Sequence, residues 1–376
     1  KVGGDERAEF NGSQDYDLYL RLTEQAERSC ISRTCCTTGV PACQRGQQYL
    51  CQDLLSGSGH EGAACHYDRM GVPVDAVTMV PNTPGFYKTD YTITKPGRVS
   101  VLIPSCDHSG DLRVCVESIY RKTTYRILKS SSLRTTARSL PPSAATSSCK
   151  RSTRTPCMCS HGRHRLQLQR LNNFGARAAT GEYLLLLNND TEVISPRWME
   201  EMVMYAQQDR VGCVGAKLLY PDNTIQHAGI GFGFLTLAAH MHKNFPVGHP
   251  GYMGRLVYAQ DVYAVTAACL MVRKDVYEQV NGLDESFAVA FNDVDFCVRV
   301  REAGYTNVFT PFAQLYHYES KSRGLDESPA KRKRFASEVE RFQKRWAKQL
   351  AVGDPCMNPN FDLMKEDFSF DIKPLE

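Results

Sequence analysis

An acidic residue follows one of the most apolar runs of this sequence, and its position suits metal chemistry. Asp190 and the amides Asn188 and Asn189 come directly after residues 182–187, which read EYLLLL. In open α/β sheets ligands bind where strands end, so a carboxylate held there can face a ligand. Hard divalent ions such as Mg²⁺ and Mn²⁺ prefer carboxylate oxygens and also bind diphosphates. We therefore expect a divalent metal at Asp190, with a diphosphate-bearing ligand beside it.

Two further acids stand at the start of an expected helix. Asp293 and Asp295 lie at the beginning of the helical pattern over residues 292–303. Residues i and i+2 point to different sides of a helix, so one acid can face a site while the other caps the helix or forms a salt bridge. An acid that faces a site can act as a general base.

A histidine is a further candidate ligand. His317 follows the strand expected over residues 307–316, and Lys321 and Arg323 come shortly after it. Imidazole nitrogen binds divalent metals, and the two cations favour an anionic ligand. These residue types fit a metal-bound diphosphate, although a structural histidine with satisfied hydrogen bonds is the simpler interpretation of His317 alone.

Apolar runs alternate with amphipathic segments, and these elements must position the candidate residues. The run over residues 99–104 is typical of a buried parallel strand, and residues 111–120 have the apolar spacing of a helix. A strand, a turn and a helix in that order open a βαβ unit. Similar patterns predict strands over 182–187, 211–220 and 307–316, a buried apolar segment over 264–273, and helices over 171–179, 196–207, 292–303 and 331–350. The chain is therefore predicted to be of the α/β class.

Five segments, taken in order, carry a recognisable pattern. They read VSVLIPSCDHSGDLRVCVESIYRKTTY, NNFGARAATGEYLLLLNNDTEV, AACLMVRKDVYEQVNGLDESF, NDVDFCVRVREAGY and HYESKSRG. Together they resemble family 2 glycosyltransferases, particularly the tandem-domain enzymes of bacterial surface-polysaccharide assembly. The resemblance covers about residues 96–125 and 170–323. It implies the GT-A fold, a Rossmann-like mixed sheet flanked by helices.

The resemblance also implies a role for each matching residue. Asp190 matches the metal-binding aspartate of the family's DXD-type motif, in which Asn188 replaces the usual first aspartate. Asp293 matches the catalytic base, which usually follows Glu, whereas Asn292 takes that place here. His317 matches a histidine that helps hold metal and diphosphate. The donor nucleotide sugar is assigned to Pro104, Asp107, Asn173, Gly175, Asn189 and Asp190.

The activity implied by the resemblance is inverting transfer of a sugar from a nucleotide-sugar donor to a hydroxyl of a saccharide or lipid-linked acceptor. Asp293 would take the proton of that hydroxyl, and Mg²⁺ or Mn²⁺ on Asp190 would neutralise the leaving diphosphate. The net charge of +4 is too small to favour nucleic acid, but it suits anionic substrates or a membrane surface. No apolar run reaches the ~20 residues of a spanning helix. We therefore expect a cytoplasmic enzyme that can associate peripherally with the inner membrane.

Two segments, about residues 29–64 and 126–169, lack helical or strand periodicity and are rich in Ser, Thr, Arg, Cys and Gly. Structureless stretches of that length are unusual inside a compact domain. For one choice of codons, residues 129–139 read two nucleotides later encode IIIVENNSTE, a strand followed by a polar turn. We therefore interpret both segments as frame-shifted translations, and we expect the chain as given to lack the family's second strand.

The opening residues repeat a pattern found near the end of the resemblance. Asp15, Asp17, Arg21 and Glu24 have the spacing of Asp293, Asp295, Arg299 and Glu302. The repeat predicts that residues 1–28 end a preceding glycosyltransferase domain, and a chain that begins at Lys1 is expected to be a fragment of a longer protein. The expected organisation continues with a linker over 29–95, a GT-A domain over 96–323, and a C-terminal helix and tail over 324–376.

Three other interpretations fit parts of the sequence. A catalytically inactive remnant of a glycosyltransferase domain would keep the fold without turnover. A nucleotidyltransferase also carries acids at strand ends, but SCDHSG is a poor match to its Gly-rich phosphate loop. Zinc could bind through Cys157, Cys159, His161 and His164, at a spacing unlike that of a standard finger. Several of the other cysteines lie in apolar segments, where a free Cys behaves as a small core residue.

Overall fold

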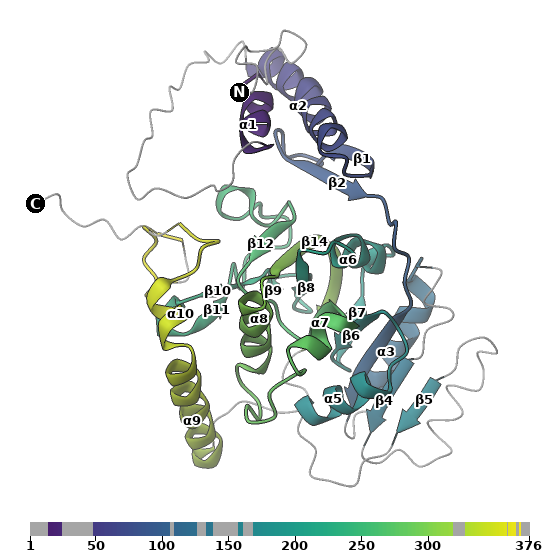
Figure 1. Ribbon diagram of the computed structural model, residues 1–376, viewed down its shortest axis with the longest axis vertical. Helices are drawn as coiled ribbons and strands as arrows, with labels where there is room; N and C mark the ends of the chain where they lie inside the picture. Colours follow the sequence, from purple (N-terminus) through teal and green to yellow (C-terminus); the bar gives the residue numbers. More distant parts are fainter. Residues whose placement is uncertain are drawn as a thin grey trace, which may run out of the picture. The chain divides into compact units, whose positions relative to one another are not determined.

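The computed structural model divides the chain into two compact units, whose elements are labelled in Figure 1. It describes residues 14–24, 48–105, 109–125, 133–137, 157–160, 168–318, 328–358, 360–365 and 368–369. Unit 1 comprises Lys1–Thr92, Pro250–Tyr258 and Asn358–Asn360, and unit 2 comprises Ile93–His249, Ala259–Met357 and Phe361–Glu376.

Unit 2 is built around a mixed sheet of 10 strands. Its main path runs β12-β14-β8-β13-β6-β3-β4-β5, while β7 pairs with β14 and β9 pairs with β8. The strands are β3 (Val99–Ser105), β4 (Leu133–Ala137), β5 (Cys157–Ser160), β6 (Tyr183–Leu187), β7 (Thr191–Val193), β8 (Val211–Leu219), β9 (Ile225–His227), β12 (Gln260–Val262), β13 (Cys269–Arg273) and β14 (Thr306–His317). β3 is parallel to β4 and β6, whereas β13 is antiparallel to β6 and β8.

Helices flank this sheet, which confirms the predicted α/β class (Figure 1). They are α3 (Ser109–Lys122), α5 (Leu168–Ala178), α6 (Trp198–Ala206), α7 (Lys274–Gln279), α8 (Asn292–Glu302), α9 (Pro329–Arg345) and α10 (Ala347–Val352). Unit 2 also contains a small antiparallel pair, β10 (Ile230–Phe232) and β11 (Ala238–His240), and the 3₁₀ turn η3 (Phe234–Thr236). A second 3₁₀ turn, η4 (Tyr252–Gly254), belongs to unit 1.

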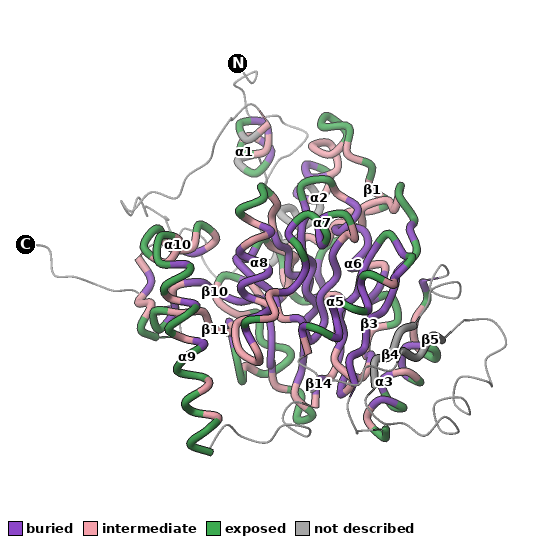
Figure 2. The backbone as a smooth tube through the Cα atoms, turned by 60° about the horizontal axis from the view of Figure 1, so that its bottom comes forward, coloured by how far each residue is buried: buried purple, intermediate pink, exposed green. Residues whose placement is uncertain are grey.

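The core lies along the central strands. β3, β6 and β8 are buried over their whole length, and Figure 2 shows buried backbone through the middle of this unit. Strands that are covered on both faces have no solvent side, so their sequences are continuously apolar instead of alternating. No helix in the described ranges has the length and hydropathy needed to cross a bilayer.

The expectation that the chain lacks the second strand of the sheet is wrong. β4 pairs in parallel with β3, with Leu102 opposite Arg134, and β5 pairs in turn with β4. Both strands fall within residues 126–169, where no periodicity predicts them. A ladder of backbone hydrogen bonds does not require an apolar pattern, and the threonines of β4 favour an extended backbone. The position beside β3 is therefore filled by the chain as it stands.

Unit 1 contains two helices and a hairpin. They are α1 (Gln14–Glu24), α2 (Gln48–Met70), and the antiparallel strands β1 (Val74–Met79) and β2 (Tyr87–Tyr91). α2 begins inside the segment 29–64, although no helical periodicity there predicts it. Within α1, Nε of Arg21 lies 2.9 Å from Oδ2 of the buried Asp17. The predicted repeat of acid and arginine thus forms a buried ion pair.

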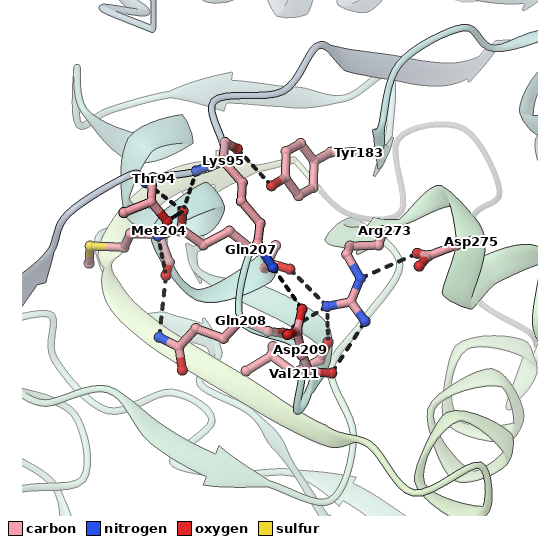
Figure 3. A network of polar contacts seen from close by, with 11 residues as sticks. Thr94, Lys95, Tyr183, Met204, Gln207, Gln208, Asp209, Val211, Arg273 and Asp275 are labelled. Atoms are coloured by element: carbon pink, nitrogen blue, oxygen red, sulfur yellow. Dashed lines mark hydrogen bonds and ion pairs between the residues drawn. The ribbon is translucent and has the colours of Figure 1, made fainter. Parts of the chain in front are cut away.

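An arginine-centred network closes the edge of the unit 2 sheet where β6 begins (Figure 3). β13 runs antiparallel to β6, so its last residue, Arg273, lies at this edge. The guanidinium donates to the carbonyl oxygen of Gln208 at 2.7 Å. Nearby, the side-chain oxygen of Gln207 accepts the N–H groups of Thr94 and Lys95 at 2.9 and 3.1 Å. These contacts join the turn after α6 to β13 and to the segment before β3.

Candidate functional site

The opposite edge of the sheet, where β6 ends, carries the first predicted motif. The N–H of Asn188 donates to the carbonyl oxygen of Ala268 at 3.0 Å, which ties the end of β6 to the start of β13. The chain then turns into β7, in which Thr191 pairs with His317, the last residue of β14. This pairing of two short strand ends brings His317 beside Asp190.

Asp190 and His317 are in contact and largely withdrawn from solvent. Nε2 of His317 lies 3.3 Å from Oδ1 of Asp190, and the two side chains are 9% and 8% exposed. Nδ2 of Asn188 lies 3.1 Å from the same ring nitrogen. Two residues that the sequence assigns to a metal are thus neighbours, with an amide beside them.

Gln226, from β9, determines which nitrogen of His317 carries the proton. Its Nε2 donates to the carbonyl oxygen of His317 at 3.5 Å, which leaves Oε1 facing Nδ1 at 2.6 Å. An amide oxygen can only accept, so Nδ1 is the protonated nitrogen of the neutral ring. Nε2 then directs its lone pair toward Asp190.

This geometry fits a divalent ion. Two ligand atoms bound to one Mg²⁺ in octahedral geometry lie about 3 Å apart, and the Asp190 and His317 atoms lie 3.3 Å apart. Within the residues that the structure describes, no group of three or more His, Cys, Asp or Glu side chains could hold an ion. An ion at this pair would therefore take its other ligands from a diphosphate and water, a common arrangement for Mg²⁺.

Asp293 lies at the start of α8, as predicted, and its carboxylate is held by two backbone groups. Oδ2 accepts the N–H of Ala267 at 3.2 Å, and Oδ1 accepts the N–H of Val294 at 2.9 Å. Ala267 directly precedes Ala268, the residue that binds the backbone of Asn188. Residues 267–268 therefore hold both the Asp293 carboxylate and the backbone of Asn188, at the edge of the sheet that carries Asp190.

A pair of histidines, absent from the sequence-based prediction, adjoins this segment. Nε2 of the buried His227 accepts the N–H of Thr266 at 3.4 Å, so its proton is on Nδ1, which donates to Nδ1 of His240 at 2.9 Å. Burial lowers the pKa of His227 well below its usual value, and nearby His240 and His317 lower it further. His227 therefore stays neutral. The only sequence signal for it is a polar residue in the short apolar run 225–232.

The residues assigned to the nucleotide fall in two places. Pro104 is buried in β3, next to Ser105, whose hydroxyl accepts a hydrogen bond from Nδ2 of Asn189 at 3.3 Å. β3 and β6 are adjacent, so these residues share the edge that carries Asp190. Asp107 lies outside the described residues.

Asn173 and Gly175 lie together in α5. Oδ1 of Asn173 accepts from the Tyr277 hydroxyl at 2.7 Å and from the N–H of Leu283 at 2.9 Å, and Nδ2 donates to the Leu283 carbonyl at 2.9 Å. Its amide thus ties α5 to the chain after α7. A Cβ on Gly175 would come within 3.2 Å of Leu102, so this glycine allows α5 to lie close to β3.

The other acid of α8 forms the expected salt bridge. Oδ2 of Asp295, which is fully buried, lies 2.9 Å from Nε of Arg299. Burial raises the pKa of Asp295, although Arg299 and Arg345 oppose this change. Asn292, at the place where the family usually has Glu, donates from Nδ2 to the carbonyl oxygen of Val289 at 2.6 Å. Asp293 and Asp295 thus have separate partners, as their spacing predicts.

Buried thiols belong to the core. Cys115, Cys213, Cys269 and Cys297 are free and buried, which confirms the prediction for cysteines in apolar segments. Burial raises the pKa of the Cys115 thiol to about 12, so it is not reactive. Of the proposed zinc ligands, Cys157 and Cys159 lie in β5, while His161 and His164 are outside the described residues.

Comparisons with known proteins identify the family. The family described as "Glycosyltransferase like family 2" matches residues 96–338. An uncharacterized protein of Sinorhizobium fredii is 37% identical over 374 residues, which cover 96% of this chain and 40% of that protein. The O-antigen biosynthesis protein RfbC of Myxococcus xanthus is 30% identical over 381 residues, which cover 98% of this chain and 28% of RfbC. The chain thus spans less than half the length of either relative.

A solved structure supports the same fold. The crystal structure of GalNAc-T7 with UDP, GalNAc and Mn²⁺ has a TM-score of 0.52 and 14% sequence identity. The similarity covers 67% of this chain and 49% of that one. At this identity the likeness concerns the fold alone. The chain therefore belongs to glycosyltransferase family 2 and is a glycosyltransferase with the GT-A fold.

Proposed function

We propose that unit 2 transfers a sugar, with inversion, from a nucleotide-sugar donor to a hydroxyl of a saccharide or lipid-linked acceptor. The observation that carries the proposal is the shared attachment of both motifs: Ala267 binds the Asp293 carboxylate at 3.2 Å, and Ala268 binds Asn188 at 3.0 Å. RfbC is an O-antigen biosynthesis protein. Its similarity to the present chain favours a saccharide-bearing acceptor for unit 2.

Asp293 is proposed as the general base. Each of its oxygens accepts one backbone N–H, and together these hydrogen bonds hold the carboxylate in one orientation. The carboxylate would take the proton from the acceptor hydroxyl while that oxygen bonds to the anomeric carbon. The bond from that carbon to the diphosphate oxygen breaks on the opposite side, so the configuration inverts and the nucleoside diphosphate leaves.

Asp190 and His317 are proposed to hold Mn²⁺ or Mg²⁺. The bound ion would supply positive charge to the leaving diphosphate. The donor set of one carboxylate and one imidazole suits Mn²⁺, which accepts nitrogen more readily than Mg²⁺. GalNAc-T7, which has the same fold, was crystallised with UDP and Mn²⁺. We therefore propose Mn²⁺ as the preferred ion.

The donor nucleotide is proposed to lie over the ends of β3 and β6. Pro104 and Asn189 would line this position, to which the family resemblance also assigns Asp107. Gly175 would contribute by allowing α5 to lie close to β3. Asn173 would act indirectly, because its amide is already engaged with Leu283 and Tyr277.

Residues 1–28 are proposed to end a preceding copy of the glycosyltransferase domain, with 29–95 as the linker. The buried pair Asp17–Arg21 supports this, because its Nε–Oδ2 distance of 2.9 Å equals that of Asp295–Arg299. The greater length of both relatives is consistent with further domains in proteins of this kind.

The test uses the whole chain with Mn²⁺, a panel of nucleotide sugars and a panel of saccharide and lipid-linked acceptors, and it measures release of nucleoside diphosphate. Asp293→Asn should lower release by about 10² to 10⁴-fold, the range for loss of a general base, and should retain Mn²⁺-dependent binding of the nucleoside diphosphate. Asp209→Asn, at an acid that is 89% exposed, is the control and should release product at the wild-type rate.

Full transfer activity in Asp293→Asn would overturn the assignment of the base. A wild-type chain that binds nucleoside diphosphate with Mn²⁺ but turns over no donor would instead favour the inactive remnant of a glycosyltransferase domain.

A further inference from the structure

Helix α9 presents one side to the segment that leads into α8. Phe335, Glu338, Phe342 and Arg345 recur every three or four residues, so they lie along one face of the helix, and Trp346 follows directly. The contacts run in reverse order along the chain: Arg345 with Asp284, Phe342 with Phe287, Glu338 with residues 289–290, and Phe335 with Phe291. α9 therefore runs antiparallel to residues 284–291, the segment that leads to Asp293.

Glu338 makes the most specific of these contacts. Its side chain is almost fully buried, at 4% exposed. Oε1 accepts the N–H of Val289 at 3.0 Å, and Oε2 accepts the N–H of Ala290 at 3.1 Å. Hydrogen bonds from neutral N–H groups to a charged carboxylate are stronger than those between neutral groups. One carboxylate thus fixes two consecutive peptide groups just before α8.

Phe291, the next residue, is held in an unusual conformation. Its φ of 61° is in the left-handed region, which is unfavourable for a residue with a large side chain, and α8 begins here without a side-chain cap. Its ring stacks on Phe342, with centroids 4.8 Å apart, and on Phe335, at 5.9 Å. Two rings of α9 therefore stabilise the turn that aims the first residues of α8.

A second anchor lies just beyond Asp293. Oδ1 of the buried Asp295 accepts from Nε1 of Trp346 at 3.1 Å and lies 3.2 Å from Nη1 of Arg345. A comparable arrangement occurs within unit 1, where Arg69 of α2 lies 3.9 Å from Oδ1 of Asp17. The end of α9 thus contacts α8 at Asp295, two residues after Asp293, whereas Glu338 contacts the chain before Asp293.

We propose that Glu338 is a positioning residue for the acceptor-activating carboxylate of Asp293. In the described structure, Glu338 contacts neither Asp293 nor the candidate metal ligands Asp190 and His317. It acts by holding residues 289–291, which set the direction in which α8 starts. The proposal rests on the function proposed above for Asp293, and it extends the catalytic unit to α9, beyond residue 323.

The test compares Glu338→Gln with Glu340→Gln, a matched change at an exposed position on the same helix. Glu338→Gln turns one oxygen into a donor that faces a backbone N–H, so it should lower kcat for nucleoside diphosphate release at least about tenfold, the scale expected when a catalytic group is misplaced. Its Mn²⁺-dependent affinity for UDP, GDP or dTDP, whichever the wild type binds, should be unchanged. Glu340→Gln should match the wild type in both measurements.

A second readout does not depend on activity. Amide hydrogen exchange should be slow at Val289 and Ala290 in the wild type and faster in Glu338→Gln. If Glu338→Gln does not fold, Phe335→Ala replaces it: Phe335 is 43% exposed, and its loss should lower kcat and speed the same exchange without unfolding the chain.

Wild-type kcat in Glu338→Gln would overturn the inference, and so would unchanged exchange at residues 289–290. A parallel loss of nucleotide affinity and kcat would also overturn it, since that would indicate general damage to the unit. If the wild type releases no nucleotide, the proposed function fails, and the exchange result alone decides whether Glu338 holds this segment.

Discussion

Oε1 of Gln226 lies 2.6 Å from Nδ1 of His317, on the side of the ring opposite Asp190. This contact orients the imidazole and sets its tautomer, so that Nε2 faces the carboxylate. A hydrogen-bond acceptor on the far ring nitrogen of a metal-ligating histidine acts in this way and raises the basicity of the ligand nitrogen. The candidate metal pair, Asp190 and His317, therefore depends on Gln226, a residue outside the family motifs of this sequence.

Gln226→Leu should weaken Mn²⁺ binding. The change leaves Nδ1–H of His317 without its acceptor in a buried place, and loss of such a partner typically costs about 10 to 100-fold in metal affinity. Gln226→Glu keeps an acceptor oxygen and should retain most of the affinity. Calorimetric titration of Mn²⁺ and a nucleoside diphosphate measures both. Equal affinity in the Leu variant and the wild type would contradict the role of Gln226.

Removal of the metal should abolish nucleotide binding. EDTA should release the nucleoside diphosphate from the wild type, and excess Mn²⁺ should restore binding, because an ion held by Asp190 and His317 would supply the positive charge that attracts the diphosphate. His317→Ala should need a higher Mn²⁺ concentration for the same binding. Nucleotide affinity that survives EDTA would show that the diphosphate is held without an ion at Asp190 and His317.

Asn173→Ala should destabilise unit 2. The side chain makes three buried hydrogen bonds to Leu283 and Tyr277, and each is worth about 1 kcal/mol, so a loss of about 2 to 4 kcal/mol is expected. Asn172→Ala is the neighbouring control, because Oδ1 of Asn172 has no hydrogen-bond partner, and it should cost less. Urea denaturation measures the free energy of unfolding. Equal losses in the two variants would contradict the role given to the Asn173 amide.

Stability should fall on the acid side through His227. Burial lowers the pKa of His227 in the folded chain below the usual 6.5. Just below pH 6.5 the imidazole is therefore protonated in the unfolded chain but not in the folded chain. The stability is therefore fully present above about pH 6.5 and is lost as the pH falls below that value, by up to about 1.4 kcal/mol per pH unit. Melting temperatures between pH 8 and 5 should fall less steeply for His227→Gln than for the wild type.

The control for this measurement is His249→Gln, at an exposed position. Its melting curve should keep the acid-side slope of the wild type. A wild-type slope in His227→Gln would mean that other groups cause the acid sensitivity.

Much of the sheet could be predicted because its central strands are continuously apolar. The run over residues 182–187 predicts β6 to within one residue, and the helix over 292–303 matches α8. β4 and β5 could not be predicted, because their residues carry no apolar pattern and their place is set by the open side of β3. The frame-shift interpretation of residues 29–64 and 126–169 stays a prediction, which the gene sequence would test.

The candidate site also contains residues that the sequence predicts and residues that it does not. Asp190 and His317 are predictable as polar residues at strand ends, and the structure brings them together because β7 pairs with β14. Gln226 and Glu338 are not predictable from spacing, since each acts through two hydrogen bonds to residues far away in the sequence. A single amide in a short strand and a single acid on a charged helix look like ordinary surface residues in the sequence.

The contacts of Trp346 and Arg345 with Asp295 determine where the coding sequence can be truncated for expression of unit 2. The family match stops at residue 338, so a truncation there looks natural from sequence similarity. Such a recombinant protein would retain the buried Asp295 with Arg299 but lack both the indole and the second guanidinium that lie 3.1 and 3.2 Å from its Oδ1. The family match ends before the residues that surround the buried Asp295 carboxylate are complete, whereas the two relatives match 96% and 98% of the chain, so the stop codon belongs after α10.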